Sequence, residues 1–381
     1  MLKNIYTDRF ILSSLTKRKE EGRYRELVVS GSGVDFFSND YLGLARSSTL
    51  FERSHQLVKQ YSGNFNGATG SRLLSGNSEL FEQTEINIAK FHKAESALIF
   101  NSGYDANLGF FSTVPQKGDL IFYDEYIHAS IRDGIRLSLA DAYSFVHNSI
   151  SSLQTKIQSV SLIKKDFKRI FIVVESIYSM DGDQAPLSAL AEFCKEHNYL
   201  LITDEAHALG IYGNEGEGLV QSLGIESLFF ARIYTYGKAL GVHGASICGS
   251  TYLKEYLINF CRTFIYSTAL SPHAIASIQC AYQQMITSNE ERLILKNNAQ
   301  YYASLLNDTS NIDSPIKSLI LSGNKNVKHL ANQLQGLGYE VRPILSPTVP
   351  ENKERLRICL HSYNTQEEIK KLIQHIQEYI V

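Results

Sequence analysis

The sequence predicts an α/β protein with a large domain, built on a mostly parallel sheet, and a smaller C-terminal α+β domain. Short apolar runs alternate with helix-like segments from about residue 95 onwards. Such runs are typical of strands that helices cover on both faces of a sheet. The chain has 381 residues, more than one hydrophobic core usually holds. In the last ~100 residues the regular alternation ends, and this change predicts the smaller domain.

The N-terminal part, residues 1–45, is expected to form a helix followed by short strands. An amphipathic pattern over residues 5–25 predicts the helix, with Ile11, Leu12 and Leu15 facing inward. The β-like pieces that follow it lie at residues 26–29 and 34–37.

Residues 46–285 are expected to form the large domain. Ser78 can accept a backbone hydrogen bond and so begin a helix that runs to Ala89. Apolar runs predict strands at residues 97–100, 119–122, 169–174, 199–203, 229–234 and 246–248. The segments between them predict helices at residues 105–114, 128–140 and 187–196.

The small domain is expected over residues 286–381. Its helices are predicted at residues 327–337 and 367–379, and its strands at residues 339–343 and 354–360. The sequence contains no internal repeat and no low-complexity linker.

Charge and composition exclude several classes of protein. The net charge is −2, so no general attraction to nucleic acid or to an anionic membrane is expected. No run approaches the ~18 apolar residues of a membrane span, and the N-terminus lacks the apolar core of a signal peptide. The five cysteines form no Cys-x-x-Cys pair, which favours free thiols over zinc ligands or disulfides. These features predict a cytoplasmic protein.

A lysine and an aspartate follow two of the predicted buried strands. Lys238 lies in Tyr234-Thr-Tyr-Gly-Lys-Ala-Leu-Gly241, and Asp204 begins Asp204-Glu-Ala-His207. Ligands of parallel sheets bind beyond the carboxyl ends of the strands. An amine that holds an aldehyde as a Schiff base, and a carboxylate that keeps a pyridine nitrogen protonated, are what pyridoxal phosphate (PLP) needs. Taken alone, the lysine could be a surface residue and the aspartate a helix cap.

Further polar residues cluster after the predicted strands. Gly103 and Tyr104 open a helix whose backbone N–H groups suit a phosphate, and Thr235 could hold a phosphate oxygen. His207 could donate to a phenolic oxygen of the cofactor, and His128 could stack on its ring. Ser179 could also face the cofactor. Each of these residues could instead have a purely structural role, as a helix cap or a packing residue.

Other ligands fit the sequence poorly. Asp181-Gly-Asp183 lacks the spaced ligands and the closing glutamate of a calcium loop, so no metal site is expected. The glycine-rich segment at residues 63–76 is not followed by Gly-Lys-Ser/Thr and is therefore no nucleotide P-loop. No Gly-x-Gly-x-x-Gly follows a first strand, which argues against a nicotinamide-binding dehydrogenase.

Taken in order, seven motifs resemble those of the α-oxoamine synthases, PLP enzymes of the aspartate aminotransferase fold. The motifs are Ser38-Asn-Asp-Tyr-Leu-Gly-Leu44, Ser71-Arg-Leu-Leu-Ser-Gly76, Ser102-Gly-Tyr104, His128-Ala-Ser130, Ser179-Met-Asp-Gly182, Asp204-Glu-Ala-His207 and Thr235-Tyr-Gly-Lys238. The resemblance runs from about residue 10 to the C-terminus. It implies the PLP-dependent transferase fold type I, with a seven-stranded sheet in the large domain.

The resemblance also implies roles for single residues. The catalytic residues would be Lys238, which carries PLP, Asp204 at its ring nitrogen and His128 over its ring. The other cofactor contacts would be Gly103, Tyr104, Ser179, His207, Thr235 and, in a neighbouring subunit, Ser267 and Thr268. The substrate contacts would be Arg25, Asn39, Thr348 and Arg357, of which Arg357 suits a carboxylate best.

Within this family, the chain is most similar to the branch that condenses L-alanine with a pimeloyl thioester in biotin biosynthesis. Residues 264–272 and Ser346-Pro-Thr-Val-Pro350 carry this likeness. Coenzyme A and an acyl carrier protein both remain open as the acyl carrier. Glycine with acetyl-CoA is the alternative substrate pair. The family implies a homodimer with shared active sites, and a non-catalytic partner subunit would be expected to lack Lys238.

Overall fold

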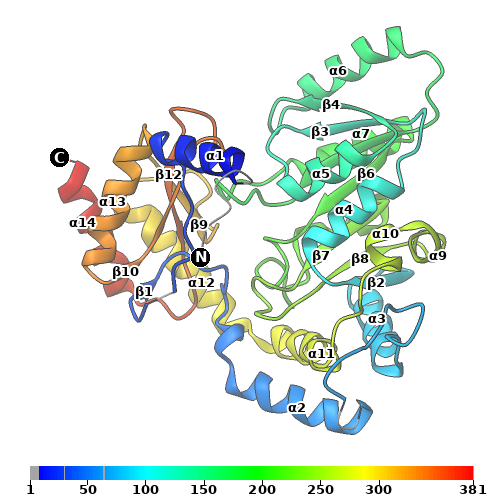
Figure 1. The fold of residues 1–381 in the computed structure, drawn as a ribbon, viewed down its shortest axis with the longest axis horizontal. Coiled ribbons are helices and arrows are strands. Elements are labelled where there is room, and N and C mark those ends of the chain that lie inside the picture. The colour runs from blue at the N-terminus through cyan, green and yellow to red at the C-terminus, as the bar shows by residue number, and fades with distance from the viewer. Residues whose placement is uncertain (1–7, 30, 63–64, 381) are drawn as a thin grey trace. The chain divides into compact units, whose positions relative to one another are not determined.

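The computed structural model describes residues 8–29, 31–62 and 65–380, which form two compact units (Figure 1). The larger unit comprises residues 39–179 and 183–295. The smaller unit comprises the chain up to residue 38, residues 180–182, and the chain from residue 296 on. The division at residues 1–45, 46–285 and 286–381 stays a prediction.

A seven-stranded sheet forms the centre of the larger unit, in the order β2-β8-β7-β6-β5-β3-β4. Its strands are β2 (Ser96–Phe100), β3 (Leu120–Asp124), β4 (Asp141–Phe145), β5 (Ile170–Glu175), β6 (Leu200–Asp204), β7 (Ala231–Thr235) and β8 (Ala245–Gly249). Strand β8 is antiparallel to both of its neighbours, and all the other pairs are parallel. The carboxyl ends of six strands therefore lie at one edge, which confirms the mostly parallel seven-stranded sheet.

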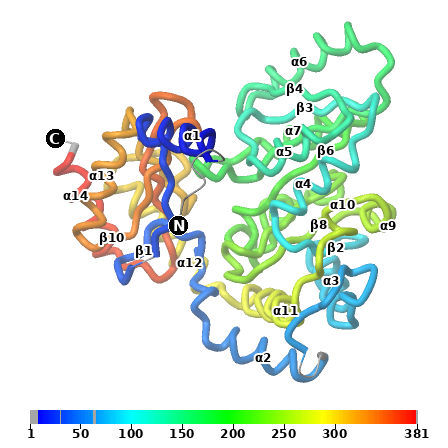
Figure 2. Tube along the Cα trace, viewed as in Figure 1, coloured from blue at the N-terminus to red at the C-terminus, as the bar shows by residue number. Residues whose placement is uncertain are grey.

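Helices surround this sheet. They are α2 (Ser48–Ser62), α3 (Glu79–Phe91), α4 (Gly103–Thr113), α5 (Ala129–Leu137), α6 (Ile150–Ile163), α7 (Leu187–His197), α8 (Leu219–Ser222), α9 (Thr251–Phe260), α10 (Arg262–Ile265) and α11 (Pro272–Thr287), with 3₁₀ turns η1 (Leu44–Arg46) and η2 (Glu226–Leu228). Helix α4 packs on β2, β7 and β8, and α7 packs on β6. Helices α2 and α11, far apart in the sequence, run side by side (Figure 2).

The sheet owes its stability to apolar side chains that leave water when the strands and helices pack. Strand β5 is buried along its whole length, as its apolar sequence predicts. Phe110 and Phe111 of α4 are fully buried and belong to the same core cluster as Phe171 and Ile202 of the central strands. This rigid core fixes the strand ends from which the polar residues project.

Several elements were not predicted from the sequence: the strands β4 and β9 (Ile316–Ile320) and, among the longer helices, α2, α6, α9, α11 and α12 (Asn289–Leu305). Strand β4 lies at the edge of the sheet, and only Phe145 of its five residues is buried. An edge strand needs no continuous apolar run, so the pattern that predicts buried strands missed it. The following helix, α6, buries only Leu153, Ile157 and Val160.

The smaller unit contains two small sheets and the helices α1 (Arg9–Glu20), α13 (Asn324–Gly336) and α14 (Gln366–Ile380). The antiparallel sheet has the order β11-β12-β9, with β9 (Ile316–Ile320), β11 (Arg342–Ile344) and β12 (Arg355–Cys359). Strand β1 (Val34–Asp35) pairs with β10 (Tyr339–Glu340). Helix α12 (Asn289–Leu305) begins in the larger unit and ends in the smaller one.

Two expectations for the N-terminal part are wrong. Ile11, Leu12 and Leu15 of α1 are exposed, because the helix has an apolar side but buries no residue within the chain. Residues 26–29 form no strand. The predicted helix began at residue 5, and residues 5–7 lie outside the described part of the chain.

Among the described residues, no helix combines the length and the apolar composition that crossing a bilayer requires.

Candidate active site

Polar residues gather where the parallel strands of the larger unit end. Strands β5, β6 and β7 end at Glu175, Asp204 and Thr235. The loops that follow the parallel strands carry the predicted cofactor residues Gly103, His128, Ser179, His207 and Lys238. The sheet topology therefore brings together, at one edge, residues that are up to 135 positions apart (238 − 103).

The carboxylate of Asp204 is held by two donors. The backbone N–H of Ala206 donates to Oδ1 over 2.8 Å, and the Asn107 side-chain amide donates to Oδ2 over 2.8 Å. Asp204 is buried, at 6% exposure, and lies at the end of a central strand. A carboxylate fixed in this way has a set direction, as a partner for a protonated ring nitrogen requires.

His128 precedes helix α5 and is held from both its backbone and its ring. Its backbone N–H donates to Oε1 of Glu175. Its ring Nδ1 lies 3.2 Å from the backbone nitrogen of Ser130 and 2.7 Å from the Ser130 hydroxyl. Burial, and after it the positive charge of Lys238, lower the pKa of His128. The imidazole is therefore neutral near neutral pH.

His207 belongs to a second hydrogen-bonded group. The hydroxyl of Tyr41 lies 2.9 Å from Nδ1 of His207 and 3.1 Å from Oδ1 of Asn39. Tyr41 is completely buried, and His207 is 4% exposed. Asn39, predicted as a substrate contact, therefore meets the His207 network through Tyr41.

Gly103 and Thr235 lie against each other. A Cβ atom on Gly103 would lie 2.3 Å from Oγ1 of Thr235, so only glycine fits beside this hydroxyl. Gly103 is the first residue of α4, and the Ser102 side chain caps the helix by accepting from the backbone N–H of Asp105. A helix N-terminus beside a hydroxyl is a setting that favours a phosphate.

Tyr104 has a hydrogen-bond partner within the larger unit, and its role at the cofactor phosphate stays a prediction. Its hydroxyl donates to Oδ2 of Asp133, and this hydrogen bond raises the pKa of Tyr104. Tyr104 is 44% exposed, so its ring remains accessible at the start of α4.

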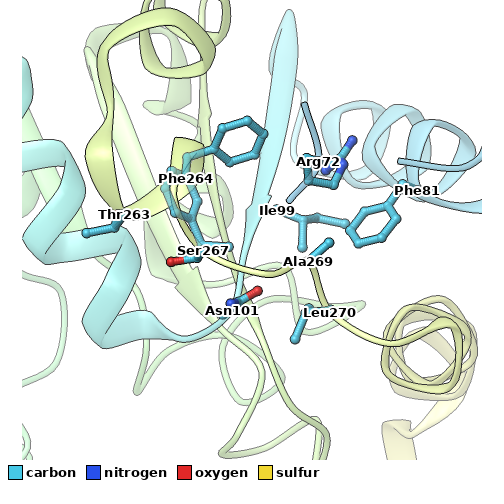
Figure 3. A pocket seen from close by; sticks show the side chains of 10 residues that line it. Arg72, Phe81, Ile99, Asn101, Thr263, Phe264, Ser267, Ala269 and Leu270 are labelled. Carbon is cyan, nitrogen blue, oxygen red and sulfur yellow. The ribbon is translucent and has the colours of Figure 1, made fainter. Parts of the chain in front are cut away.

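Ser267 and Thr268 lie beside the end of β2 in their own chain. The side-chain amide of Asn101 donates to the backbone oxygen of Thr268 over 2.8 Å. Ten residues, including Asn101 and Ser267, line a small pocket there (Figure 3). The role of both hydroxyls in a neighbouring subunit stays a prediction.

Arg72, on another wall of this pocket, is engaged with the protein itself. Its guanidinium lies 2.7 Å from Oε1 of Glu85 and stacks over the ring of Phe81. Glu85 is 1% exposed and also accepts from Lys254 and from the backbone of Ile99. A buried ion pair thus joins Arg72 of the glycine-rich segment to helix α3, and Glu85 in turn accepts a hydrogen bond from β2.

The remaining predicted substrate contacts belong to the smaller unit. Arg25 is exposed in the segment after α1, and Thr348 is exposed in the loop before β12. Arg357 lies within β12 and is partly buried. Their roles stay predictions.

The carboxylates of the rejected calcium motif have protein partners. Asp183 accepts from His147 and Asn148, and His147 also contacts Asp124 at 2.9 Å. Asp181 pairs with Arg355 in the smaller unit. Both carboxylates of the motif are therefore used in protein contacts.

No individual role was predicted from the sequence for four residues of this site. Asn107, Ser130, Glu175 and Tyr41 hold the predicted residues in place. Asn107 gave the clearest signal, because it is a lone amide in a helix whose neighbours are apolar. A buried polar side chain needs a partner, and here the partner is Asp204.

The larger unit fits the PLP that the sequence predicts. It offers an amine (Lys238), a carboxylate with a fixed direction (Asp204), and a glycine–threonine cradle that a Cβ atom would fill. These groups suit the aldehyde, the ring nitrogen and the phosphate respectively.

Comparison with known proteins gives a consistent result. A family model described as aminotransferase class I and II matches residues 32–376. An 8-amino-7-oxononanoate synthase from Emericella nidulans is 41% identical to this chain, over 96% of it and 94% of the relative. The Lysinibacillus sphaericus enzyme of that name is 36% identical, over 94% of this chain and 91% of the relative.

Solved structures are also similar. The 8-amino-7-oxononanoate synthase of Francisella tularensis matches with a TM-score of 0.78 and 32% identity, over 92% of this chain and 98% of that one. Serine palmitoyltransferase from S. paucimobilis, solved with a bound PLP–myriocin aldimine, matches with a TM-score of 0.88 over 99% and 98%. Its identity is 23%, so it supports the fold alone.

Proposed function

Because this chain belongs to the aminotransferase class I and II family and, within it, to the PLP-dependent α-oxoamine synthases, we propose that it condenses L-alanine with a pimeloyl thioester. The products are 8-amino-7-oxononanoate, CO2 and the free thiol, and the reaction belongs to biotin biosynthesis. The observation that carries this proposal is the 41% identity to the Emericella nidulans enzyme, which extends over 96% of the chain.

PLP, when bound, supplies an aldehyde that joins an amine and a ring that accepts electrons from the substrate α-carbon. Lys238 is the amine that holds the aldehyde. Once alanine is bound, the Lys238 amine would remove the α-proton and would later return a proton to the product. The α-carbon then bonds to the thioester carbonyl carbon as the thiol leaves, and the alanine carboxylate departs as CO2.

The surrounding residues orient these reactants. Asp204 keeps a proton on the ring nitrogen, and its two hydrogen-bond donors support that role. His207 and Ser179 would face the phenolic oxygen of the cofactor. Gly103, Tyr104 and Thr235 hold the phosphate, and the Gly103–Thr235 contact supports this.

His128 has two roles in this proposal. Its ring would lie over the cofactor, and its Nε2–H would donate to the thioester carbonyl oxygen as negative charge develops there. The backbone bond to Glu175 and the ring contact with Ser130 support a fixed ring orientation. Because its pKa is lowered, His128 donates as a neutral imidazole.

The substrate-binding residues are proposed from the resemblance of this chain to its family. We propose that Arg357 binds the alanine carboxylate through its planar guanidinium. Arg25, Asn39 and Thr348 contact the acyl chain or its terminal carboxylate. Coenzyme A and an acyl carrier protein are both candidate carriers of the acyl group.

The assembly we propose is a cytoplasmic homodimer in which Ser267 and Thr268 reach the cofactor phosphate of the neighbouring subunit. The exposed apolar side chains of α1, among them Phe10 and Leu12, support a subunit contact. All five cysteines are buried free thiols, which suits a reducing compartment.

A product assay tests the function. The purified protein is given L-alanine, glycine or L-serine, each with pimeloyl-CoA, pimeloyl-acyl carrier protein or acetyl-CoA, and the products are identified by mass. The fastest reaction should use L-alanine and a pimeloyl thioester, and Lys238→Ala should form no product. Faster formation of 2-amino-3-ketobutyrate from glycine and acetyl-CoA would overturn the proposal in favour of a glycine C-acetyltransferase.

A further inference from the structure

A continuous chain of hydrogen bonds links Asp204 to His128 through two residues that have no assigned role. The Asn107 amide nitrogen lies 2.8 Å from Oδ2 of Asp204 and 3.0 Å from Oγ of Ser130. The Ser130 hydroxyl lies 2.7 Å from Nδ1 of His128. Asn107 is 1% exposed and Ser130 is fully buried, so water does not compete for these bonds.

The chemistry of the groups determines which atom donates and which accepts in each of these hydrogen bonds. The backbone N–H of Ser130 can only donate, and it points at Nδ1 of His128. Nδ1 must therefore be the acceptor, so the proton of the neutral ring is on Nε2. The Ser130 hydroxyl likewise donates to Nδ1, and its oxygen accepts one of the two amide protons of Asn107.

The orientation of the Asn107 amide follows from the same chemistry. A carboxylate only accepts, so the nitrogen of the amide, and not its oxygen, faces Asp204. Oδ1 of Asn107 is buried, and no hydrogen-bond partner is found for it among the described residues. Both amide protons are thus used for Asp204 and Ser130, while the carbonyl is left unpaired.

We propose that Asn107 and Ser130 are positioning residues that couple the direction of the Asp204 carboxylate to the Nε2–H tautomer of His128. This inference rests on the cofactor roles given to Asp204 and His128 under the proposed function. It does not depend on which thioester or amino acid reacts. At one end of this series of hydrogen bonds, Asn107 orients the Asp204 carboxylate. At the other end, Ser130 keeps the proton of His128 on Nε2, which points away from Ser130.

The first test follows the cofactor rather than turnover. PLP dissociation constants are measured for Ser130→Ala, Asn107→Ser and the double variant. Asn107→Ser removes a hydrogen bond to a charged group, so this variant should bind PLP at least about tenfold more weakly. Ser130→Ala should weaken binding in the wild type but change little when Asn107 is already replaced. Multiplicative effects of the two changes would overturn the coupling.

Ser54→Ala is the matched control. Ser54 is also buried, in α2, and its hydroxyl donates to the backbone oxygen of Leu50. Removing it should leave the PLP dissociation constant unchanged. A loss of affinity as large as that of Ser130→Ala would show a general packing effect and would overturn the positioning role.

Asn107→Asp keeps the shape of the side chain and gives a second test. It places a carboxyl group where an amide donated to Asp204, so the two groups must share a proton. PLP binding by this variant should strengthen, relative to wild type, as the pH falls from about 8 to about 5.5. A pH profile of binding that matches wild type would contradict the Asn107–Asp204 contact.

Nitrogen NMR of ¹⁵N-histidine-labelled holoenzyme reads the tautomer directly, with His128→Asn used to assign the signal. The expected spectrum has a protonated Nε2 and an unprotonated Nδ1 for His128. A protonated Nδ1 would overturn the inference. This result is independent of the product assay, so a wrong substrate assignment would leave it standing.

Discussion

Glu175 and Asp204 occupy paired positions at the carboxyl ends of the neighbouring strands β5 and β6. Burial, reinforced by the negative charge of Asp204, raises the pKa of Glu175 well above its usual range. This shift favours the neutral form of Glu175 beside the Asp204 carboxylate. In this neutral form, Glu175 accepts a hydrogen bond from the backbone N–H of His128.

Exchanging each acid for its amide should separate these two roles. Glu175→Gln keeps a neutral acceptor, so kcat should stay within about threefold of wild type, a change below 1 kcal/mol. Asp204→Asn removes the charge that holds the ring proton, and kcat should fall on the order of 10²-fold or more. Steady-state kinetics of the two variants check this. Equal losses in both would contradict the assignment of the charge to Asp204.

Gly103→Ala should weaken cofactor binding. The added Cβ would lie 2.3 Å from Oγ1 of Thr235, and overpacking of this kind costs about 1–3 kcal/mol. The PLP dissociation constant, followed by the visible absorption of the bound cofactor, should therefore rise roughly tenfold. Gly336→Ala is the control, since nothing lies within 4 Å of a Cβ there. Unchanged affinity in Gly103→Ala would argue against a phosphate at the start of α4.

Glu205 should make the protein less stable as the pH rises through neutrality. Burial raises its pKa to about 7, against hydrogen bonds from the backbone of Val220 and Leu219 that lower it. The folded state thus holds a proton that the unfolded chain releases near its ordinary value of 4.5. The free energy of unfolding should fall between about pH 5 and pH 8, by up to about 3 kcal/mol.

The measurement is chemical denaturation at both pH values. Glu205→Gln should remove most of the fall, and the exposed Glu192→Gln should retain it. A fall of wild-type size in Glu205→Gln would place its source elsewhere.

His147 should give the opposite dependence on pH. Burial by itself lowers its pKa, but hydrogen bonds to Asp124 and Asp183 raise it to about 10. Because the pKa of His147 is higher in the folded protein, its charged ring stabilises the fold. This stabilisation is complete below pH 6.5, the ordinary pKa of histidine, and disappears as the pH rises through about 10. At pH 7, His147→Gln should lower the free energy of unfolding by about 1.5–3 kcal/mol.

Denaturation at pH 7 and above pH 10 measures this difference. It should shrink at the higher pH, because the wild-type ring is then neutral. The exposed His197→Gln should show no such change. A difference that is equal at both pH values would mean that the charge of His147 does not stabilise the fold.

Site residues could be predicted from the sequence where a reactive or ionisable residue stands shortly after an apolar strand. Lys238, Asp204 and His207 all lie within four residues of the end of an apolar run, so their place at the edge of the sheet could be predicted. The link from Asn107 to Asp204 could not, because it joins residues 97 positions apart. Ser130 and Glu175 were hidden for the same reason, since only the packing of α4, α5 and β5 brings them to His128.

Which side chains are exposed could also not be predicted reliably from the sequence. The apolar positions of α1 predict one apolar side, but periodicity does not say what covers that side, and Leu12 is 63% exposed in the chain. Strand β4 was missed because an edge position allows polar residues such as Asp141 and Ser144. Both failures concern what lies next to an element, which its own sequence does not encode.

Peptide mapping after borohydride reduction tests the central claim most directly, namely that Lys238 carries the cofactor. Reduction fixes the aldehyde carbon of PLP to the amine that holds it. Digestion and mass spectrometry then locate the added mass. We predict the adduct on the peptide that contains Lys238 and on no other lysine, with none in Lys238→Ala. An adduct on a different lysine, or unlabelled Lys238 in protein saturated with PLP, would contradict the account.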